Sequence, residues 1–186
     1  FEHSFEEPAL WERDLAVGYS IERRYAGFAS ADYAGKPVIG IVNTWSEMNP
    51  CHAHFRLRAD EVKRGVWQAG GFPVELPAMS LGEPMMKPTT MLYRNLLAME
   101  VEELLRANPI DGCVLLGGCD KTTPSLIMGA ASTDLPSIVV TGGPMLSGWF
   151  RGERVGSGTA LWQMSEDIKA GKMTQEDFLE TEQAMS

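Results

Sequence analysis

The chain has 186 residues, of which 44% are hydrophobic and 22% are charged, and its formal net charge is −9. This length and composition are typical of a globular domain with a substantial core. The acidic balance argues against a broad binding surface for nucleic acid or for an anionic membrane. No apolar run approaches the roughly 20 residues that cross a bilayer, and the acidic start FEHSFEEPALWERD lacks the hydrophobic segment of a signal peptide.

Residues 1–35 show no clear pattern and are predicted to form an N-terminal arm. From residue 36 onward, strand-like runs alternate with helical patterns. The expected strands are 36–44, 72–77, 111–118 and 137–143. The expected helices are 53–69, 89–107, 124–132, 160–170 and 174–185, the last with Thr174 as its N-cap and an acidic first turn. This alternation predicts an α/β fold at 36–186, with a parallel sheet of about four strands and helices on both faces.

Polar or reactive side chains, or backbone amides of glycines, follow each expected strand. Because the carboxyl ends of parallel strands meet at one edge of a sheet, and ligands bind there, these residues are expected to converge. They are Asn43, Thr44 and Cys51 after the first strand, Glu83 after the second, Cys119, Asp120 and Lys121 after the third, and Thr141, Gly142 and Gly143 after the fourth.

The three cysteines have different expected roles. Their odd number and irregular spacing do not resemble a disulfide framework, so we expect reduced thiols and a cytoplasmic protein. Cys113 lies inside a strand and is expected in the core. Cys51 starts a helix, where it either packs as a small residue or acts as a thiolate ligand or nucleophile. Cys119 follows two glycines in a polar turn, which favours a ligand.

Hard donors lie beside these soft ones. Asp120 either caps the following helix or binds a metal, and Glu83 is either an exposed loop carboxylate or a second metal ligand. Lys121 is either a surface residue or, held near a metal, an amine of lowered pKa that acts as a base or is modified. Thiolates and carboxylates in one site suggest two metals of different character. Two cysteines, however, are too few to hold an iron–sulfur cluster in the usual way.

Four stretches together resemble the N-terminal part of the dihydroxyacid and sugar-acid dehydratases, and within that family the aldonate branch. The stretches are NTWSEMNPCHAHF, VKRGVWQAGGFPVELP, LGEPMMKPTTMLYRNL and GCVLLGGCDKTTPSLIMGAASTDLPSIVVTGGPM. The resemblance implies dehydration of a sugar acid such as L-arabinonate to a 2-keto-3-deoxy acid. It also implies a [2Fe–2S] cluster, or a [4Fe–4S] cluster in some members, and a nearby Mg²⁺.

The resemblance also implies roles for individual residues. Cys51 and Cys119 resemble two of the three cluster thiolates, and Glu83 and Asp120 resemble Mg²⁺ ligands. Lys121 resembles a lysine that becomes carbamylated and then binds Mg²⁺, with a part in catalysis.

Family members are several times longer than this chain, and they are dimers or tetramers. The third cluster cysteine would lie just past residue 186, and a serine proposed as the base belongs to a C-terminal β-barrel domain. We therefore expect the chain to be a fragment that does not catalyse by itself.

Three alternatives remain open at this stage. The first is a dihydroxyacid dehydratase of branched-chain amino-acid synthesis, which shares the chemistry. The second is a non-catalytic zinc module built from Cys51, His52 or His54, and Cys119. The third is a nucleotide-binding α/β domain, which the absence of the usual phosphate-loop spacings disfavours.

Overall fold

The computed structural model describes residues 28, 30–144 and 146–185. Most of the predicted arm at 1–35 therefore lies outside the described residues. The chain divides into two compact units, Phe1–Gly142 and Gly143–Ser186. All of the predicted site residues except Gly143 belong to the first unit.

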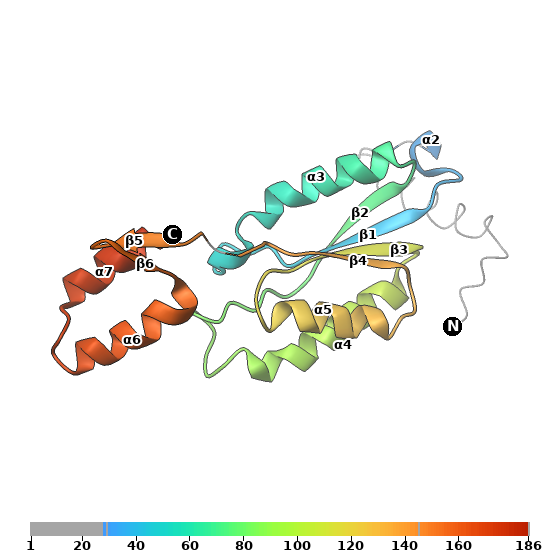
Figure 1. Ribbon diagram of the computed structural model, residues 1–186. Helices are drawn as coiled ribbons and strands as arrows, with labels where there is room; N and C mark the ends of the chain where they lie inside the picture. Colours follow the sequence, from blue (N-terminus) through green and yellow to red (C-terminus); the bar gives the residue numbers. More distant parts are fainter. Residues whose placement is uncertain (1–27, 29, 145, 186) are drawn as a thin grey trace. The chain divides into compact units, whose positions relative to one another are not determined.

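The first unit is built on a four-stranded parallel sheet in the order β2-β1-β3-β4 (Figure 1). The strands are β1 (Val38–Asn43), β2 (Phe72–Pro77), β3 (Gly112–Leu116) and β4 (Ser137–Val140). This confirms the predicted α/β fold. The strand order reverses between β1 and β3, which makes the loops after these two strands the expected place for a ligand.

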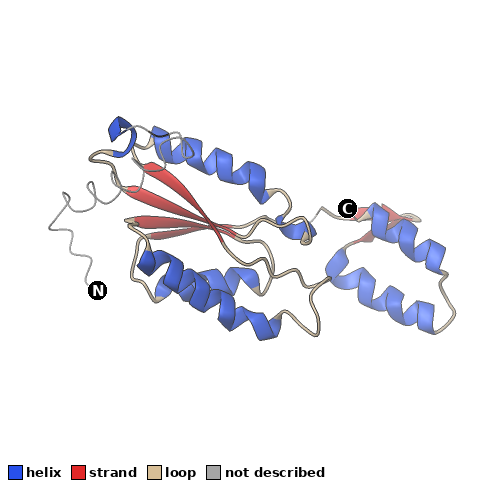
Figure 2. Cartoon of the chain, turned by 180° about the vertical axis from the view of Figure 1, so that it is seen from behind, coloured by secondary structure: helices blue, strands red, loops and turns tan. Residues whose placement is uncertain are grey.

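Helices cover both faces of this sheet, as expected (Figures 1 and 2). The helix α3 (Phe55–Gln68) lies on one face, while α4 (Met91–Ala107) and α5 (Thr122–Ala131) lie on the other. Two short elements complete the unit, the helix α2 (Ser30–Tyr33) and the 3-10 turn η1 (Pro50–His52).

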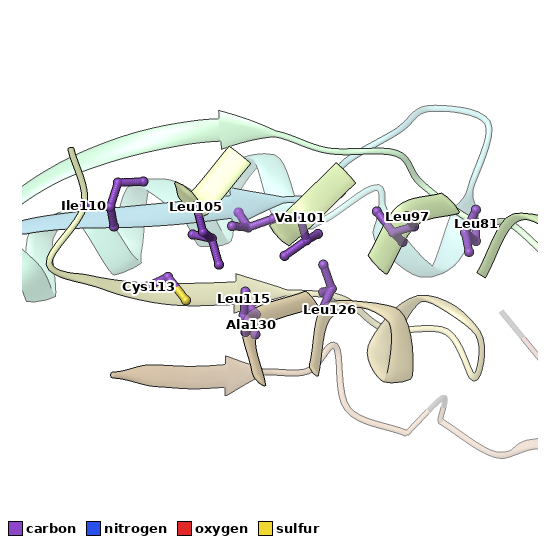
Figure 3. Close-up of a cluster of buried hydrophobic side chains, with 10 residues drawn as sticks. Leu81, Leu97, Val101, Leu105, Ile110, Cys113, Leu115, Leu126 and Ala130 are labelled. Carbon is purple, nitrogen blue, oxygen red and sulfur yellow. The ribbon is translucent and has the colours of Figure 1, made fainter. Parts of the chain in front are cut away.

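The central strands β1 and β3 are mostly apolar because their successive side chains enter opposite cores. Ile41 and Leu116 pack with Phe55 and Ala59 beneath α3. Their chain neighbours Val42 and Leu115 point the other way, into the larger cluster shown in Figure 3. That cluster also contains Leu81, Leu97, Val101, Leu105, Ile110, Cys113, Leu126 and Ala130.

Helices α4 and α5 approach each other closely at Gly129. A Cβ atom at this position would lie 2.5 Å from the Ala98 carbonyl oxygen and 2.7 Å from Val101 Cβ. Only a glycine fits this crossing without moving a helix. The contact matters for the site, because α5 begins at Thr122, directly after Cys119, Asp120 and Lys121.

The second unit contains the two C-terminal helices, α6 (Ser157–Lys169) and α7 (Gln175–Ala184), close to where they were expected. Thr174 caps α7 in a reciprocal capping box with Asp177. The unit also contains an antiparallel hairpin that the sequence reading did not anticipate, formed by β5 (Gly148–Phe150) and β6 (Glu153–Val155). Its two turn residues, Arg151 and Gly152, have φ angles of 49° and 84°, the left-handed values that tight hairpins require.

None of the described helices is both long and apolar enough to cross a membrane.

Candidate metal centre

The loop after β1 brings Cys51 to the carboxyl edge of the sheet. Asn49 organises this loop: its Oδ1 accepts a hydrogen bond from the Cys51 backbone N–H at 3.2 Å and thereby caps η1. The same buried amide reaches the loop after β3, where its Oδ1 and Nδ2 lie 3.7 and 3.8 Å from Cys119 Sγ. Its Nδ2 also donates to Ser80 Oγ, after β2, at 3.0 Å. One side chain therefore connects three loops at this edge.

The thiols of Cys51 and Cys119 lie close enough to interact. Both are free, Cys119 being buried and Cys51 half-buried. Burial, together with the neighbouring Cys51, raises the pKa of Cys119 to about 11. Two adjacent thiols resist ionisation in this way unless a cation offsets the charge. By contrast, Cys113 is buried in the core, with its Sγ 3.2 Å from Ser137 Oγ, as the sequence predicted.

Two carboxylates from different loops gather around Lys121. Its Nζ lies 2.7 Å from Asp120 Oδ2 and 3.3 Å from Glu83 Oε2. Glu83 is also hydrogen bonded by the buried hydroxyl of Thr90. The cap of α5 is Lys121 and no side-chain bond forms there, so the alternative role of Asp120 as a helix cap is wrong.

Beside these two carboxylates, the pKa of Lys121 is not lowered as expected. The pKa is raised, mainly because Asp120 accepts a hydrogen bond from the amine, with Glu83 contributing the same way. Two nearby carboxylates favour the charged ammonium. Desolvation acts in the opposite direction but does not outweigh them.

His52 has a role that the sequence reading missed. Its ring is fully buried, and burial lowers its pKa. Its Nδ1 lies 2.9 Å from the Thr44 carbonyl oxygen, and its Nε2 accepts a hydrogen bond from the Gly118 N–H at 3.0 Å. Both ring nitrogens are thus engaged by backbone groups, so His52 has no lone pair left for zinc. The one hint in the sequence is that His52, a polar residue, directly follows the candidate ligand Cys51.

Glycines allow the loops of this edge to approach closely. A Cβ atom on Gly118 would lie 3.1 Å from the Cys51 carbonyl oxygen. One on Gly142, after β4, would lie 3.0 Å from His54 Cε1 and 3.5 Å from the same Cys51 oxygen. The loops after β1, β3 and β4 therefore meet, as the sequence predicted. Gly143 belongs to the other unit and is not placed relative to them.

The donors gather in two pairs rather than in one complete site. Within the described ranges, no three His, Cys, Asp or Glu side chains come together closely enough to hold a metal by themselves. The soft pair is Cys51 and Cys119, and the hard pair is Glu83 and Asp120, with Lys121 between them. Each pair therefore offers two donors, of soft character in one pair and of hard character in the other.

Residues 36–186 match the model of the dihydroxy-acid/6-phosphogluconate dehydratase N-terminal family, so the chain belongs to this family. It is 65% identical over 160 residues to an L-arabinonate dehydratase from Rhizobium leguminosarum bv. trifolii, covering 86% of this chain. It is 58% identical over 160 residues, again 86% of this chain, to an L-arabonate dehydratase from Azospirillum brasilense. A 6-deoxy-6-sulfo-D-gluconate dehydratase from Pseudomonas putida is 59% identical over the same share of the chain. The chain spans 28%, 27% and 28% of the lengths of these three relatives.

Proposed function

We propose that this chain is the metal-binding N-terminal part of a hydro-lyase that dehydrates a sugar acid, such as L-arabinonate, to a 2-keto-3-deoxy acid. One observation carries the proposal: a thiol pair and a carboxylate pair meet at the sheet edge of a chain in the dehydratase family. Similarity favours a sugar acid over a branched-chain precursor. Four relatives named for sugar acids are 45–65% identical, whereas three named dihydroxy-acid dehydratase are 37–39% identical.

We propose that the thiol pair holds an iron–sulfur cluster and that the carboxylate pair holds Mg²⁺. Soft thiolates suit iron in clusters, and hard carboxylate oxygens suit Mg²⁺, so each pair fits its metal by donor chemistry. The cluster is [2Fe–2S] or [4Fe–4S]. When bound, the two groups supply Lewis acids for the leaving hydroxyl and for the substrate carboxylate.

The residues of this chain then have distinct tasks. Asn49 orients Cys51 through its backbone N–H and lies against Cys119 Sγ. Thr90 holds the Glu83 carboxylate toward the site. Lys121 bridges the two carboxylates as a cation. Its carbamylation would add CO₂ to the neutral amine with release of a proton, turning a competing cation into a third hard ligand.

The wider setting of the protein is also proposed. The substrate is a small molecule, neither nucleic acid nor a membrane is a partner, and the enzyme is a cytoplasmic homo-oligomer. We also propose that a preparation of residues 1–186 has no turnover by itself. The family resemblance assigns one cluster thiolate and the base serine to other segments.

Cluster binding is tested by anaerobic reconstitution of the full-length enzyme that carries this sequence, with ferrous iron and sulfide. We expect visible absorbance with bound iron and labile sulfide in the wild type and in Cys113→Ser, which removes a thiol from the core. Cys51→Ser and Cys119→Ser should each lose both signals. Uptake of zinc alone, or equal losses in all three variants, would contradict the assignment.

Magnesium binding is tested by calorimetric titration of the same proteins. Asp120→Asn and Glu83→Gln should each weaken Mg²⁺ binding by tenfold or more, because each removes a charged oxygen ligand. The control is Glu102→Gln, at a half-buried helix carboxylate paired with Arg106, and it should leave the affinity unchanged.

Substrate class is tested in the full-length enzyme that carries this sequence. Release of a 2-keto acid from L-arabinonate, with slower release from 2,3-dihydroxyisovalerate, is the expected result. The reverse preference would favour the branched-chain alternative.

A further inference from the structure

We propose that His52 is a positioning residue that fixes the separation between the two thiol-bearing segments through its hydrogen bond to Gly118. The proposal rests on the proposed function for its purpose, because the separation matters only if the two thiols share a ligand. The contact itself is part of the structure.

The partners of the ring determine its tautomer. The Thr44 carbonyl oxygen can only accept, so Nδ1, at 2.9 Å, carries the hydrogen. The Gly118 backbone N–H can only donate, so Nε2, at 3.0 Å, presents its lone pair. Thr44 Oγ1 donates to the Leu116 carbonyl oxygen at 2.6 Å and therefore faces Nδ1, 3.0 Å away, as an acceptor. Every hydrogen bond of the ring is consistent with one neutral tautomer.

This ring joins segments that are far apart in the chain. His52 directly follows Cys51, and Gly118 directly precedes Cys119, yet His52 and Gly118 are separated by 66 residues. The bond from Gly118 to Nε2 is therefore a direct tie between the backbones that carry the two thiols. The ring also lies 2.8 Å from Ser80 Oγ, so the loop after β2, which leads to Glu83, is attached to the same point.

Burial makes this tie rigid. The ring has no exposed surface, and Phe55 packs against it with ring centroids 5.2 Å apart. The bond is partly buried, so removing the acceptor would leave the Gly118 N–H without its protein partner. The segment Gly118–Cys119 would then shift to find another one.

Two substitutions of His52 test the hydrogen bonds of Nδ1 and Nε2 separately. The amide of His52→Gln reaches the position of Nε2 and can accept from Gly118. The amide of His52→Asn reaches only the position of Nδ1, so it can donate to Thr44 but loses Gly118. Ser80→Ala serves as a comparison, since it removes a hydrogen bond to Nδ1 of the same ring and the bond that Ser80 accepts from Asn49, but leaves the bond from Gly118 to Nε2 in place.

Thiol separation is measured by the rate at which phenylarsine oxide, which bridges two neighbouring thiols, captures the chain. All proteins carry Cys113→Ser, so that Cys51 and Cys119 are the remaining thiols. We expect His52→Gln and Ser80→Ala to react within about twofold of the parent, and His52→Asn to react about tenfold more slowly, the scale typical of supporting contacts. Reaction with a monothiol reagent should change little. The parent rate in His52→Asn, or an equal loss in His52→Gln, would overturn the proposal.

A measurement on the unaltered chain covers the case in which a variant does not fold. Nitrogen-15 spectra of the histidines should show His52 with a protonated Nδ1, a bare Nε2 and a through-bond coupling to the Gly118 amide. A protonated Nε2 would overturn the proposal. Because arsenic capture needs no cluster, a failure of iron and sulfide to bind would refute the proposed function while leaving this result intact.

Discussion

The close crossing of α4 and α5 yields a prediction in which one substitution has opposite effects at two helical sites. Gly129→Ala adds a methyl group where the Ala98 carbonyl oxygen and Val101 Cβ would lie 2.5 and 2.7 Å away. Gly65→Ala adds the same group on the exposed side of α3, where nothing lies within 4 Å. The chemistry and the helical setting are the same, so the difference isolates packing.

The magnitudes follow from two terms. Replacing glycine by alanine in a helix stabilises by about 1 kcal/mol, which should be the whole effect at Gly65. Overpacking a close contact costs about 1–3 kcal/mol, and the upper end applies at Gly129 because a backbone oxygen and a Cβ atom cannot rotate away. The net expectation is a loss of about 2 kcal/mol at Gly129, hence a difference of about 3 kcal/mol between the variants.

The free energies of unfolding are measured by urea titration, followed by circular dichroism, on both variants and the wild type. The second unit is identical in all three, so its contribution cancels in the differences. Gly129→Ala should also slow the arsenic capture of Cys51 and Cys119, because α5 starts next to the Cys119 turn. If Gly129→Ala gained as much stability as Gly65→Ala, helix propensity alone would operate and the close crossing would be refuted.

Three further predictions concern single contacts. Thr90→Val removes the hydroxyl that donates to Glu83, and we expect about a tenfold loss of Mg²⁺ affinity by calorimetry. The control is Thr89→Val, whose lost hydroxyl accepts a hydrogen bond from the Met91 N–H, and this variant should bind Mg²⁺ normally. Equal affinities of the two variants would contradict this role of Thr90. Leu97→Ala, at a fully buried position of α4, should lower the free energy of unfolding in urea by about 3 kcal/mol. Leu96→Ala, at the half-exposed neighbouring position, should lower it by less than about 1 kcal/mol. Similar losses would show that another face of α4 packs against the core. The hydrogen bonds from Thr174 lower the pKa of Asp177, so the stabilisation of α7 is present above the ordinary pKa of an aspartate and is lost as the pH falls through the lowered value. The helicity of α7, followed by nuclear magnetic resonance, should therefore decline in acid in the wild type and respond less in Thr174→Ala, and an identical response would count against the capping box.

Much of the fold could be predicted because its signals are local. Residues 38–42 are all apolar, as expected for a strand that is covered on both faces, and Gly70 and Gly71 mark the end of α3. The hairpin of β5 and β6 was not predicted, because strands of three residues carry almost no periodicity. Its turn, Arg151–Gly152, lacks the asparagine or aspartate that usually announces such a turn.

The candidate site was predictable in outline but not in its connections. The convergence of the loops carrying Cys51, Glu83 and Cys119 follows from the geometry of parallel strands. The raised pKa of Lys121 does not follow from it, because that direction depends on two carboxylates lying at 2.7 and 3.3 Å from the amine.

The sequence by itself determined which elements form and which chemical groups stand at the ends of the strands, because alternation, apolar runs and side-chain chemistry are properties of neighbouring residues. Only the tertiary structure decided the strand order β2-β1-β3-β4, which places the loops of Cys51 and Cys119 side by side. It also decided that His52 binds Gly118, 66 residues away, rather than a metal. The physical reason is that a buried polar group must find its partner among the groups that folding brings within about 3 Å, and distance along the chain carries no information about that choice.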